Sequence, residues 1–177
     1  MAARKARPVA ERGALARALA ETVLATPEVQ RAATVAAYVG VGSEPGTGPL
    51  RQALREAGKR VLLPVLRPDR DLDWATYAGE RALGEAPRGL LEPTGPRLGV
   101  DAVATADVVL VPGLAVAFDG LRLGRGGGSY DRALRRVPVG TPVWVLLHED
   151  EVGRDVPRAA HDLPVTGAAT PVEVVRF

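Results

Sequence analysis

Hydrophobic and polar residues are arranged along this chain in alternating blocks, some with a helical period and others as continuous apolar runs. In the first block, Leu15, Leu19 and Val23 recur at helical spacing. A later block ends at Gly58, a residue type that commonly stops a helix. The period predicts helices over about residues 9–25, from about Thr47 to Gly58, and over about residues 130–136.

Four continuous apolar runs are typical of buried strands, and they cover residues 34–41, 61–66, 108–111 and 142–147. Residues 72–77 alternate in polarity and predict an edge strand. Residues 78–100 are rich in glycine and proline and predict a long irregular connection. Because continuous apolar strands alternate with helices, the predicted fold class is α/β, with a largely parallel sheet that is covered on both faces.

Length and composition restrict the class of protein. The chain has 177 residues, 46% of them hydrophobic, so we expect residues 1–177 to form a single domain around one core. The absence of cysteine excludes disulfides, thiolate metal sites and cysteine nucleophiles, and it is compatible with a reducing cytosol. The basic N-terminus lacks an uninterrupted apolar stretch, so we expect a cytoplasmic chain without a membrane partner.

The charge balance gives little support to a nucleic-acid partner. The sequence has 23 basic and 21 acidic residues, which leaves a formal net charge of +2. It also lacks a basic patch interleaved with aromatic residues, so we expect no nucleic acid as a partner. Lys5 and Lys59 are the only lysines. Because arginine supplies the rest of the basic residues, a single arginine is weak support for function in this chain.

The segment from Leu110 to Arg132 carries the strongest indication of function. An apolar run leads into a loop with Arg122, Arg125 and several glycines, and a helical pattern follows directly. Glycines let backbone N–H groups approach a phosphate, the helix N-terminus adds partial positive charge, and the arginines neutralise what remains. The spacing fits neither a P-loop nor a dinucleotide fingerprint. A flexible linker is the alternative, but the flanking arginines and the strand-to-helix context favour an anion-binding loop.

Several polar residues outside the glycines have both a functional and a structural interpretation. Asp131 could hold Mg²⁺ beside phosphates, but capping of a helix is favoured when this residue is taken alone. Glu44 follows the first strand at the predicted carboxyl edge of the sheet, where ligands of open α/β folds bind, although a turn carboxylate is usually only solvated. His161 and Asp162 form a polar pair near the C-terminus. With two histidines and no cysteine, a zinc site is not expected.

The remaining conspicuous side chains have structural interpretations. Trp144 lies in a continuous apolar run and is predicted to be a core residue, and Trp74 and Tyr77 are predicted to be core or edge residues. Residues 148–150 follow the last apolar run and predict a solvated strand end. The spacing of serine and histidine supports no nucleophilic constellation.

Two motifs resemble the signature of the 5-formyltetrahydrofolate cyclo-ligase family, whose members are also called methenyltetrahydrofolate synthetases. They are VPGLA at Val111–Ala115 and GLRLGRGGGSYDR at Gly120–Arg132. The resemblance continues in the same order through nearly the whole chain, in short motifs at residues 43–47, 62–64, 90–93, 161–165 and 170–171. It implies a single-domain three-layer α/β/α fold. It also implies conversion of 5-formyltetrahydrofolate to 5,10-methenyltetrahydrofolate, dependent on ATP and Mg²⁺, with release of ADP and phosphate.

The resemblance also implies roles for individual residues. ATP would be bound by Arg122, Leu123, Gly124, Arg125, Gly126, Gly127, Gly128, Ser129 and Tyr130. Of these, Arg122 and Arg125 would act on the phosphates as catalytic residues. The reduced folate would be bound by Val39, Glu44, Gly128, Ser129 and Tyr130, and Mg²⁺ by Asp131 and Asp162. In the implied mechanism the formyl oxygen attacks the γ-phosphoryl group, N10 attacks the formyl carbon, and phosphate leaves as the ring closes.

The sequence departs from the family pattern at two places. Ser129 replaces the first of two aromatic residues that usually precede the aspartate. The N-terminal Lys-x-x-Leu-Arg segment, whose basic residues reach ATP in many members, is missing. Three alternatives stay open: the segment is lost, it is replaced by Arg4, Lys5 or Arg7, or it lies upstream of this start. If it is lost, replacing all three basic residues with alanine is expected to leave the KM for ATP unchanged.

These departures keep a second function under consideration, that of a catalytically degenerate protein that binds nucleotide or folate without turnover. The complete set of arginines and acids favours the enzyme. The expected partners are a reduced folate and ATP, and the expected assembly state is a monomer.

Overall fold

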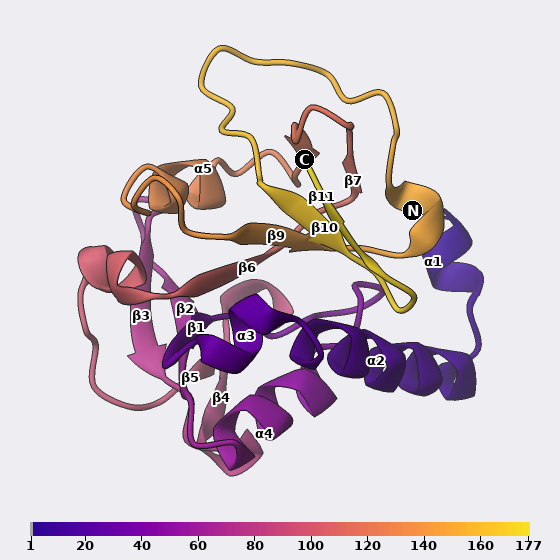
Figure 1. The fold of residues 1–177 in the computed structure, drawn as a ribbon. Helices are drawn as coiled ribbons and strands as arrows, with labels where there is room; N and C mark the ends of the chain where they lie inside the picture. The colour runs from indigo at the N-terminus through magenta and orange to yellow at the C-terminus, as the bar shows by residue number, and fades with distance from the viewer. Residues whose placement is uncertain (1) are drawn as a thin grey trace.

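The apolar runs of the sequence form the central strands of one seven-stranded sheet in the computed structural model, which describes residues 2–177 (Figure 1). The strand order is β11-β10-β9-β6-β1-β2-β3. The bounds are β1 Thr34–Ala36, β2 Arg60–Leu66, β3 Leu72–Thr76, β6 Val108–Pro112, β9 Val143–Leu146, β10 Gly167–Ala169 and β11 Val174–Arg176. Neighbouring strands from β10 to β2 pair in parallel, whereas β3 and β11 are antiparallel edge strands. The predicted α/β class and largely parallel sheet are confirmed.

Helices cover both faces of the sheet, which makes the three-layer arrangement. The helices are α1 Ala2–Ala6, α2 Val9–Leu24, α3 Pro27–Arg31, α4 Gly48–Glu56 and α5 Ser129–Leu134. Leu19 of α2 and Leu54 of α4 belong to a core cluster on one face, together with Leu63 and Trp144 of the sheet. On the other face, α5 and the 3₁₀ turn η3, Val100–Thr105, pack over a second cluster that contains Trp74. The predicted burial of the tryptophans is therefore confirmed.

The three predicted helices are present as α2, α4 and α5, with ends within two residues of the prediction. Thr47 is the residue before α4, as its position in the pattern predicts. The edge strand predicted over residues 72–77 is β3. The short elements α1, α3, β10 and β11 were not predicted, because segments of three to five residues are too short to show a period.

The strand predicted over residues 34–41 is wrong in its length, because β1 ends at Ala36. Beyond it, the Thr47 hydroxyl donates a hydrogen bond to the Tyr38 carbonyl at 2.6 Å and accepts one from the Gly40 N–H at 3.1 Å. These bonds replace strand pairing and bend the apolar chain toward α4. The apolar character of this segment therefore indicates that it is buried, but it does not indicate that it pairs as a strand.

The irregular connection predicted over residues 78–100 is also wrong in part. It contains a two-stranded hairpin of β4, Leu83–Ala86, and β5, Leu90–Pro93, which is flanked and joined by 3₁₀ turns at 80–82 (η1) and 87–89 (η2). Glycine and proline obscured the short strands, although backbone pairing satisfies their polar groups. A second hairpin joins β7, Ala115–Val116, to β8, Arg122–Leu123, and it presents the start of the glycine-rich loop.

No helix within residues 2–177 is long and apolar enough to cross a membrane.

An ion pair joins Arg136, which follows the C-terminal end of α5, to the turn between β2 and β3. The Arg136 guanidinium donates to both carboxylate oxygens of Asp71, at 2.8 and 2.6 Å. The Asp71 carboxylate also accepts a hydrogen bond from the Leu72 N–H at 2.8 Å. The Asp71 side chain is 14% exposed. The hydrogen bonds from Arg136 lower the pKa of Asp71 below its ordinary value.

Replacing Asp71 with asparagine is expected to reduce the free energy of unfolding by about 1–3 kcal/mol, because a charge-assisted bidentate pair is lost. A carboxyl group with a lowered folded-state pKa stabilises the fold above its unfolded pKa and loses this effect as pH falls. The difference between wild type and Asp71→Asn should be complete at neutral pH and shrink below about pH 4. Urea unfolding at both pH values measures it. Asp69→Asn is the control: it alters the exposed pair with Arg67 but keeps the side-chain oxygen that accepts a hydrogen bond from the Asp71 N–H. It should change stability by less than about 0.5 kcal/mol.

Candidate active site

A cleft of about 810 Å³ opens at the carboxyl ends of β1, β2 and β6. Its floor includes Tyr38 and Pro112, and its walls come from the glycine-rich loop, α5, β5 and the segment near Asp162. Carboxyl ends of parallel strands leave backbone groups and loops free to meet a ligand, which is why open α/β sheets bind ligands there. The location follows from the sheet topology.

Every site residue expected from the sequence lines this one cleft. The set comprises Val39, Glu44, Arg122, Leu123, Gly124, Arg125, Gly126, Gly127, Gly128, Ser129, Tyr130, Asp131 and Asp162. The tertiary structure thus brings together three stretches that are separated by more than thirty residues in the sequence.

The glycine-rich loop has backbone geometry that only glycine adopts easily. Gly126 has φ +85°, and Gly128, at the N-cap of α5, has φ +68°. Both angles lie in the left-handed region, where a side chain would strain the backbone. The loop therefore turns directly into the N-terminus of α5 with little side-chain bulk on its surface, as an anion-binding loop requires.

Arg122 extends from β8 to the edge of the cleft and is held on several sides. Its Nη1 donates to the Pro112 carbonyl at 3.0 Å, and its Nη2 lies 3.5 Å from a carboxylate oxygen of Asp131. The guanidinium carbon lies 5.8 Å from the centre of the Tyr130 ring. The side chain is 5% exposed. Burial lowers the pKa of Arg122, whereas the negative charge of Asp131 opposes this shift.

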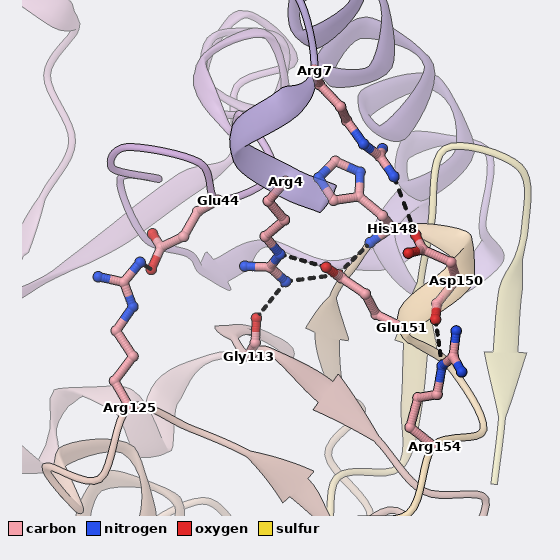
Figure 2. A network of polar contacts seen from close by, with 9 residues as sticks. All are labelled: Arg4, Arg7, Glu44, Gly113, Arg125, His148, Asp150, Glu151 and Arg154. Atoms are coloured by element: carbon pink, nitrogen blue, oxygen red, sulfur yellow. Dashed lines mark hydrogen bonds and ion pairs between the residues drawn. The ribbon is translucent and has the colours of Figure 1, made fainter. Parts of the chain in front are cut away.

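An ion pair joins the glycine-rich loop to the turn after β1. A nitrogen of Arg125 lies 3.0 Å from a carboxylate oxygen of Glu44, and Figure 2 shows the two side chains reaching toward each other. The second oxygen of Glu44 accepts a hydrogen bond from the Val41 N–H at 2.9 Å. Glu44 is 9% exposed and Arg125 is 53% exposed, so the arginine is the partner that can move into solvent or toward a ligand.

Two phenols belong to the same cleft. Burial raises the pKa of Tyr38, and desolvation also raises the pKa of Tyr130, with the negative charge of Glu44 adding to both shifts. Both side chains therefore stay protonated at neutral pH. Within residues 2–177, the buried Tyr38 hydroxyl has no hydrogen-bond partner.

The two acids lie in different local settings. Asp131 is in the first turn of α5 and faces Arg122, and its side chain is 19% exposed. Asp162 accepts a hydrogen bond from the Ala159 N–H at 2.7 Å and is 21% exposed. Among the described residues, no group of three or more histidine, aspartate and glutamate side chains could hold a metal ion. A cation here would therefore need oxygen atoms from a bound ligand as well.

The sequence interpretation missed a polar network behind the cleft. The predicted solvated strand end at residues 148–150 is confirmed for Glu149 and Asp150, which are exposed, and is wrong for His148, which is 5% exposed. A 3₁₀ turn, η4 Glu149–Glu151, follows His148. Burial lowers the pKa of His148, and the positive charge of Arg7 adds to this shift. In Figure 2, Arg4 of α1 reaches Glu151 in this turn. No spacing rule links Arg4 to Glu151, because they are far apart in the sequence. The only general signal is that charged side chains are rarely buried unless they are paired, and this applies only after burial is known.

Comparison with known proteins shows relatives across nearly the whole chain. The profile of the 5-formyltetrahydrofolate cyclo-ligase family matches residues 1–171. A 5-formyltetrahydrofolate cyclo-ligase of Mycolicibacterium smegmatis is 44% identical over 143 residues, which cover 78% of this chain and 73% of that protein. The enzyme of the same name from Escherichia coli K12 is 34% identical over 165 residues, which cover 88% of this chain and 87% of that protein.

Solved structures agree with the sequence relatives. The NMR structure of 5,10-methenyltetrahydrofolate synthetase from Aquifex aeolicus has a TM-score of 0.82 and 28% sequence identity, and the match covers 98% of this chain and 87% of that one. A synthetase structure from Mycoplasma pneumoniae, at 17% identity and a TM-score of 0.73, shares the fold. Profile, relatives and fold agree, and this chain belongs to the 5-formyltetrahydrofolate cyclo-ligase family.

Proposed function

We propose that this chain catalyses the ATP-dependent cyclisation of 5-formyltetrahydrofolate to 5,10-methenyltetrahydrofolate, with release of ADP and phosphate. The observation that carries the proposal is the meeting of the glycine-rich loop, Arg122, Arg125 and Glu44 in one cleft. Family membership over residues 1–171 supports the same activity. Because one chain forms the whole cleft, we propose that residues 1–177 act as one catalytic domain and as a monomer.

The chemistry needs two ligands side by side and neutralised phosphate charge more than it needs a protein nucleophile. The formyl oxygen attacks the γ-phosphorus, and the bond from that phosphorus to ADP breaks. N10 then attacks the formyl carbon and loses its proton. The carbon–oxygen bond breaks, phosphate leaves with the former formyl oxygen, and the methenyl bridge remains.

In the proposal, some residues of the cleft neutralise phosphate charge and others hold the nucleotide or the folate. Arg122 and Arg125 stabilise negative charge on the phosphates, and residues 124–130 hold the nucleotide through backbone N–H groups and the start of α5. Glu44 accepts hydrogen bonds from the folate, with Val39 on its apolar side. Arg125 and Glu44 pair with each other at 3.0 Å in the free protein, so binding of both ligands exchanges this ion pair for two new sets of contacts.

Mg²⁺ fits the donor set, with Asp131 and Asp162 as its protein ligands. Mg²⁺ prefers oxygen donors and is commonly held by one or two carboxylates together with substrate phosphates. Both acids line the cleft beside the glycine-rich loop. When bound, the ion would neutralise phosphate charge and orient the γ-phosphoryl group. The two arginines act on the same phosphates from the protein side.

The direct test is to mix the purified protein with 5-formyltetrahydrofolate and MgATP and to follow the near-ultraviolet absorbance of methenyltetrahydrofolate. We expect an increase that depends on ATP. Binding of ATP or folate without any increase would contradict the proposal and support the degenerate binding protein instead.

Asp131→Asn is expected to lower kcat by at least about a hundredfold, because the cleft loses a charged ligand for Mg²⁺ and Arg122 loses its ion-pair partner. The Mg²⁺ concentration that gives half-maximal activity should rise as well. A circular dichroism spectrum like that of wild type would show that the variant is folded. Full activity in this variant would contradict the assignment, and Asp69→Asn, which lies outside the cleft, serves as a control for charge.

Arg125→Gln is expected to raise the KM for MgATP about tenfold, which corresponds to the loss of roughly one charge-assisted contact to phosphate. Steady-state kinetics with each substrate varied in turn measures the change. Arg81→Gln is the matched control, because Arg81 is an exposed arginine outside the cleft. An unchanged KM for MgATP in Arg125→Gln would remove Arg125 from the phosphate site.

A further inference from the structure

One buried arginine near the N-terminus connects three segments that are distant in the sequence. Arg4 of α1 is 2% exposed. Its Nη2 donates to Glu151 at 2.6 Å and to the Gly113 carbonyl at 2.8 Å, and its Nε donates to the other carboxylate oxygen of Glu151 at 2.5 Å. Figure 2 shows this fork between η4 and the end of β6. A buried arginine with a carboxylate and a carbonyl as partners has little freedom to move.

The carboxylate partner is itself fixed. Glu151 accepts a hydrogen bond from the His148 N–H at 2.9 Å in addition to the two from Arg4. Its side chain is 12% exposed. Arg4 is therefore anchored to the segment after β9, and this anchor holds its guanidinium against the Gly113 carbonyl.

The Gly113 carbonyl is adjacent to the carbonyl that holds Arg122. The neighbouring Pro112 carbonyl accepts a hydrogen bond from Arg122 at 3.0 Å. Two successive carbonyls at the end of β6 are thus bonded to two buried arginines, one from α1 and one from β8. A shift of this short stretch of backbone would move the acceptor of Arg122.

Close packing makes the same stretch sensitive to displacement. A Cβ atom on Gly113 would lie 2.6 Å from a methyl carbon of Val145 and 3.1 Å from Cγ of Arg122. The aliphatic part of Arg122 therefore lies directly on the Gly113 backbone. Arg4 holds Gly113 through its carbonyl, and Arg122 rests against its Cα.

Arg4 does not contact a ligand in the cleft through this arrangement. The cleft-lining residues of the described chain include Gly113 and Arg122, but Arg4 is not among them. Its remaining nitrogen, Nη1, is buried and has no partner within residues 2–177. Arg4 also lines a small second cavity with Glu44, but its hydrogen bonds connect it to Arg122 through the Pro112–Gly113 backbone.

We infer that Arg4 is a positioning residue for Arg122: by holding the Gly113 carbonyl, it fixes the backbone to which the phosphate-binding arginine is bonded. This inference rests on the proposed function, in which Arg122 contacts the phosphates of ATP. It gives one of the three N-terminal basic residues a role at the nucleotide site without direct contact. It also predicts that Arg4→Ala raises the KM for ATP, in contrast to the expectation for an N-terminus whose basic residues are dispensable.

A double-mutant cycle on nucleotide affinity tests the inference without requiring turnover. The dissociation constant of MgATP is measured by calorimetry for wild type, Arg4→Ala, Arg122→Ala and the double variant. We expect Arg4→Ala to weaken binding about tenfold in the wild-type background and less than about twofold in the Arg122→Ala background, because residues that act through one another are not additive. Equal weakening in both backgrounds, or none in either, would overturn the inference.

Two further variants separate positioning from a general loss of stability. Arg176→Ala removes another bidentate arginine–glutamate pair, with Glu28, outside the cleft. It should lower the melting temperature and leave the affinity for MgATP unchanged. Arg4→Lys keeps the charge beside Glu151 and should recover part of the affinity. If both Arg4→Ala and Arg176→Ala lower the melting temperature without changing the affinity for MgATP, Arg4 contributes only to the stability of the fold.

The result can be separated from failure of the proposed function. Wild type that binds MgATP but forms no methenyltetrahydrofolate would refute the proposed reaction, while the cycle would still report on Arg4 and Arg122. The Nε–H resonance of Arg122 in the ligand-free protein gives an independent readout. It should shift or broaden in Arg4→Ala and stay unchanged in Arg176→Ala, and an unchanged resonance in Arg4→Ala would count against the inference.

Discussion

The need to satisfy polar groups at the carboxyl edge of a buried parallel sheet governs the arrangement of this protein. At the end of β6 the carbonyls of Pro112 and Gly113 need hydrogen-bond donors. Arg122 and Arg4 supply the missing donors. Burying two guanidinium groups would be costly without such acceptors and nearby carboxylates, and Asp131 and Glu151 provide the carboxylates. The Pro112–Gly113 backbone therefore connects the cleft, through Arg122, to the buried ion pair of Arg4 and Glu151.

The same pairing of buried charges occurs inside the ligand-free cleft. Arg125 pairs with Glu44, and Arg122 lies beside Asp131, so the groups expected to contact phosphate, folate and Mg²⁺ compensate one another. Such pairs keep buried or half-buried charges from being isolated. Their lengths differ, since the Arg125–Glu44 pair is short at 3.0 Å and the Arg122–Asp131 pair is long at 3.5 Å. Ligands with charges of the same kinds can replace these partners.

The fold could be predicted from the sequence where a helix or strand is long and is buried either on one face or on both faces. The helix α2 and the strand β2 have enough residues to show a period or a continuous apolar run. The prediction failed where side-chain hydrogen bonds or backbone pairing determine a structure that the hydrophobic pattern does not indicate. After Ala37, whose N–H still bonds to the Leu62 carbonyl of β2, the apolar chain bonds to the Thr47 hydroxyl in place of a strand. The hairpin of β4 and β5 is hidden by glycine and proline.

The sequence by itself determined the fold class and the family, because these depend on hydrophobic periodicity and on long motifs. Only the tertiary structure decided that Glu44 pairs with Arg125, that His148 is buried, and that Arg4 reaches Gly113 and Glu151. These contacts join residues that are about eighty to one hundred and fifty positions apart. No periodicity encodes such a distance, since it depends on how the strands are ordered in the sheet and on which loops meet at its edge.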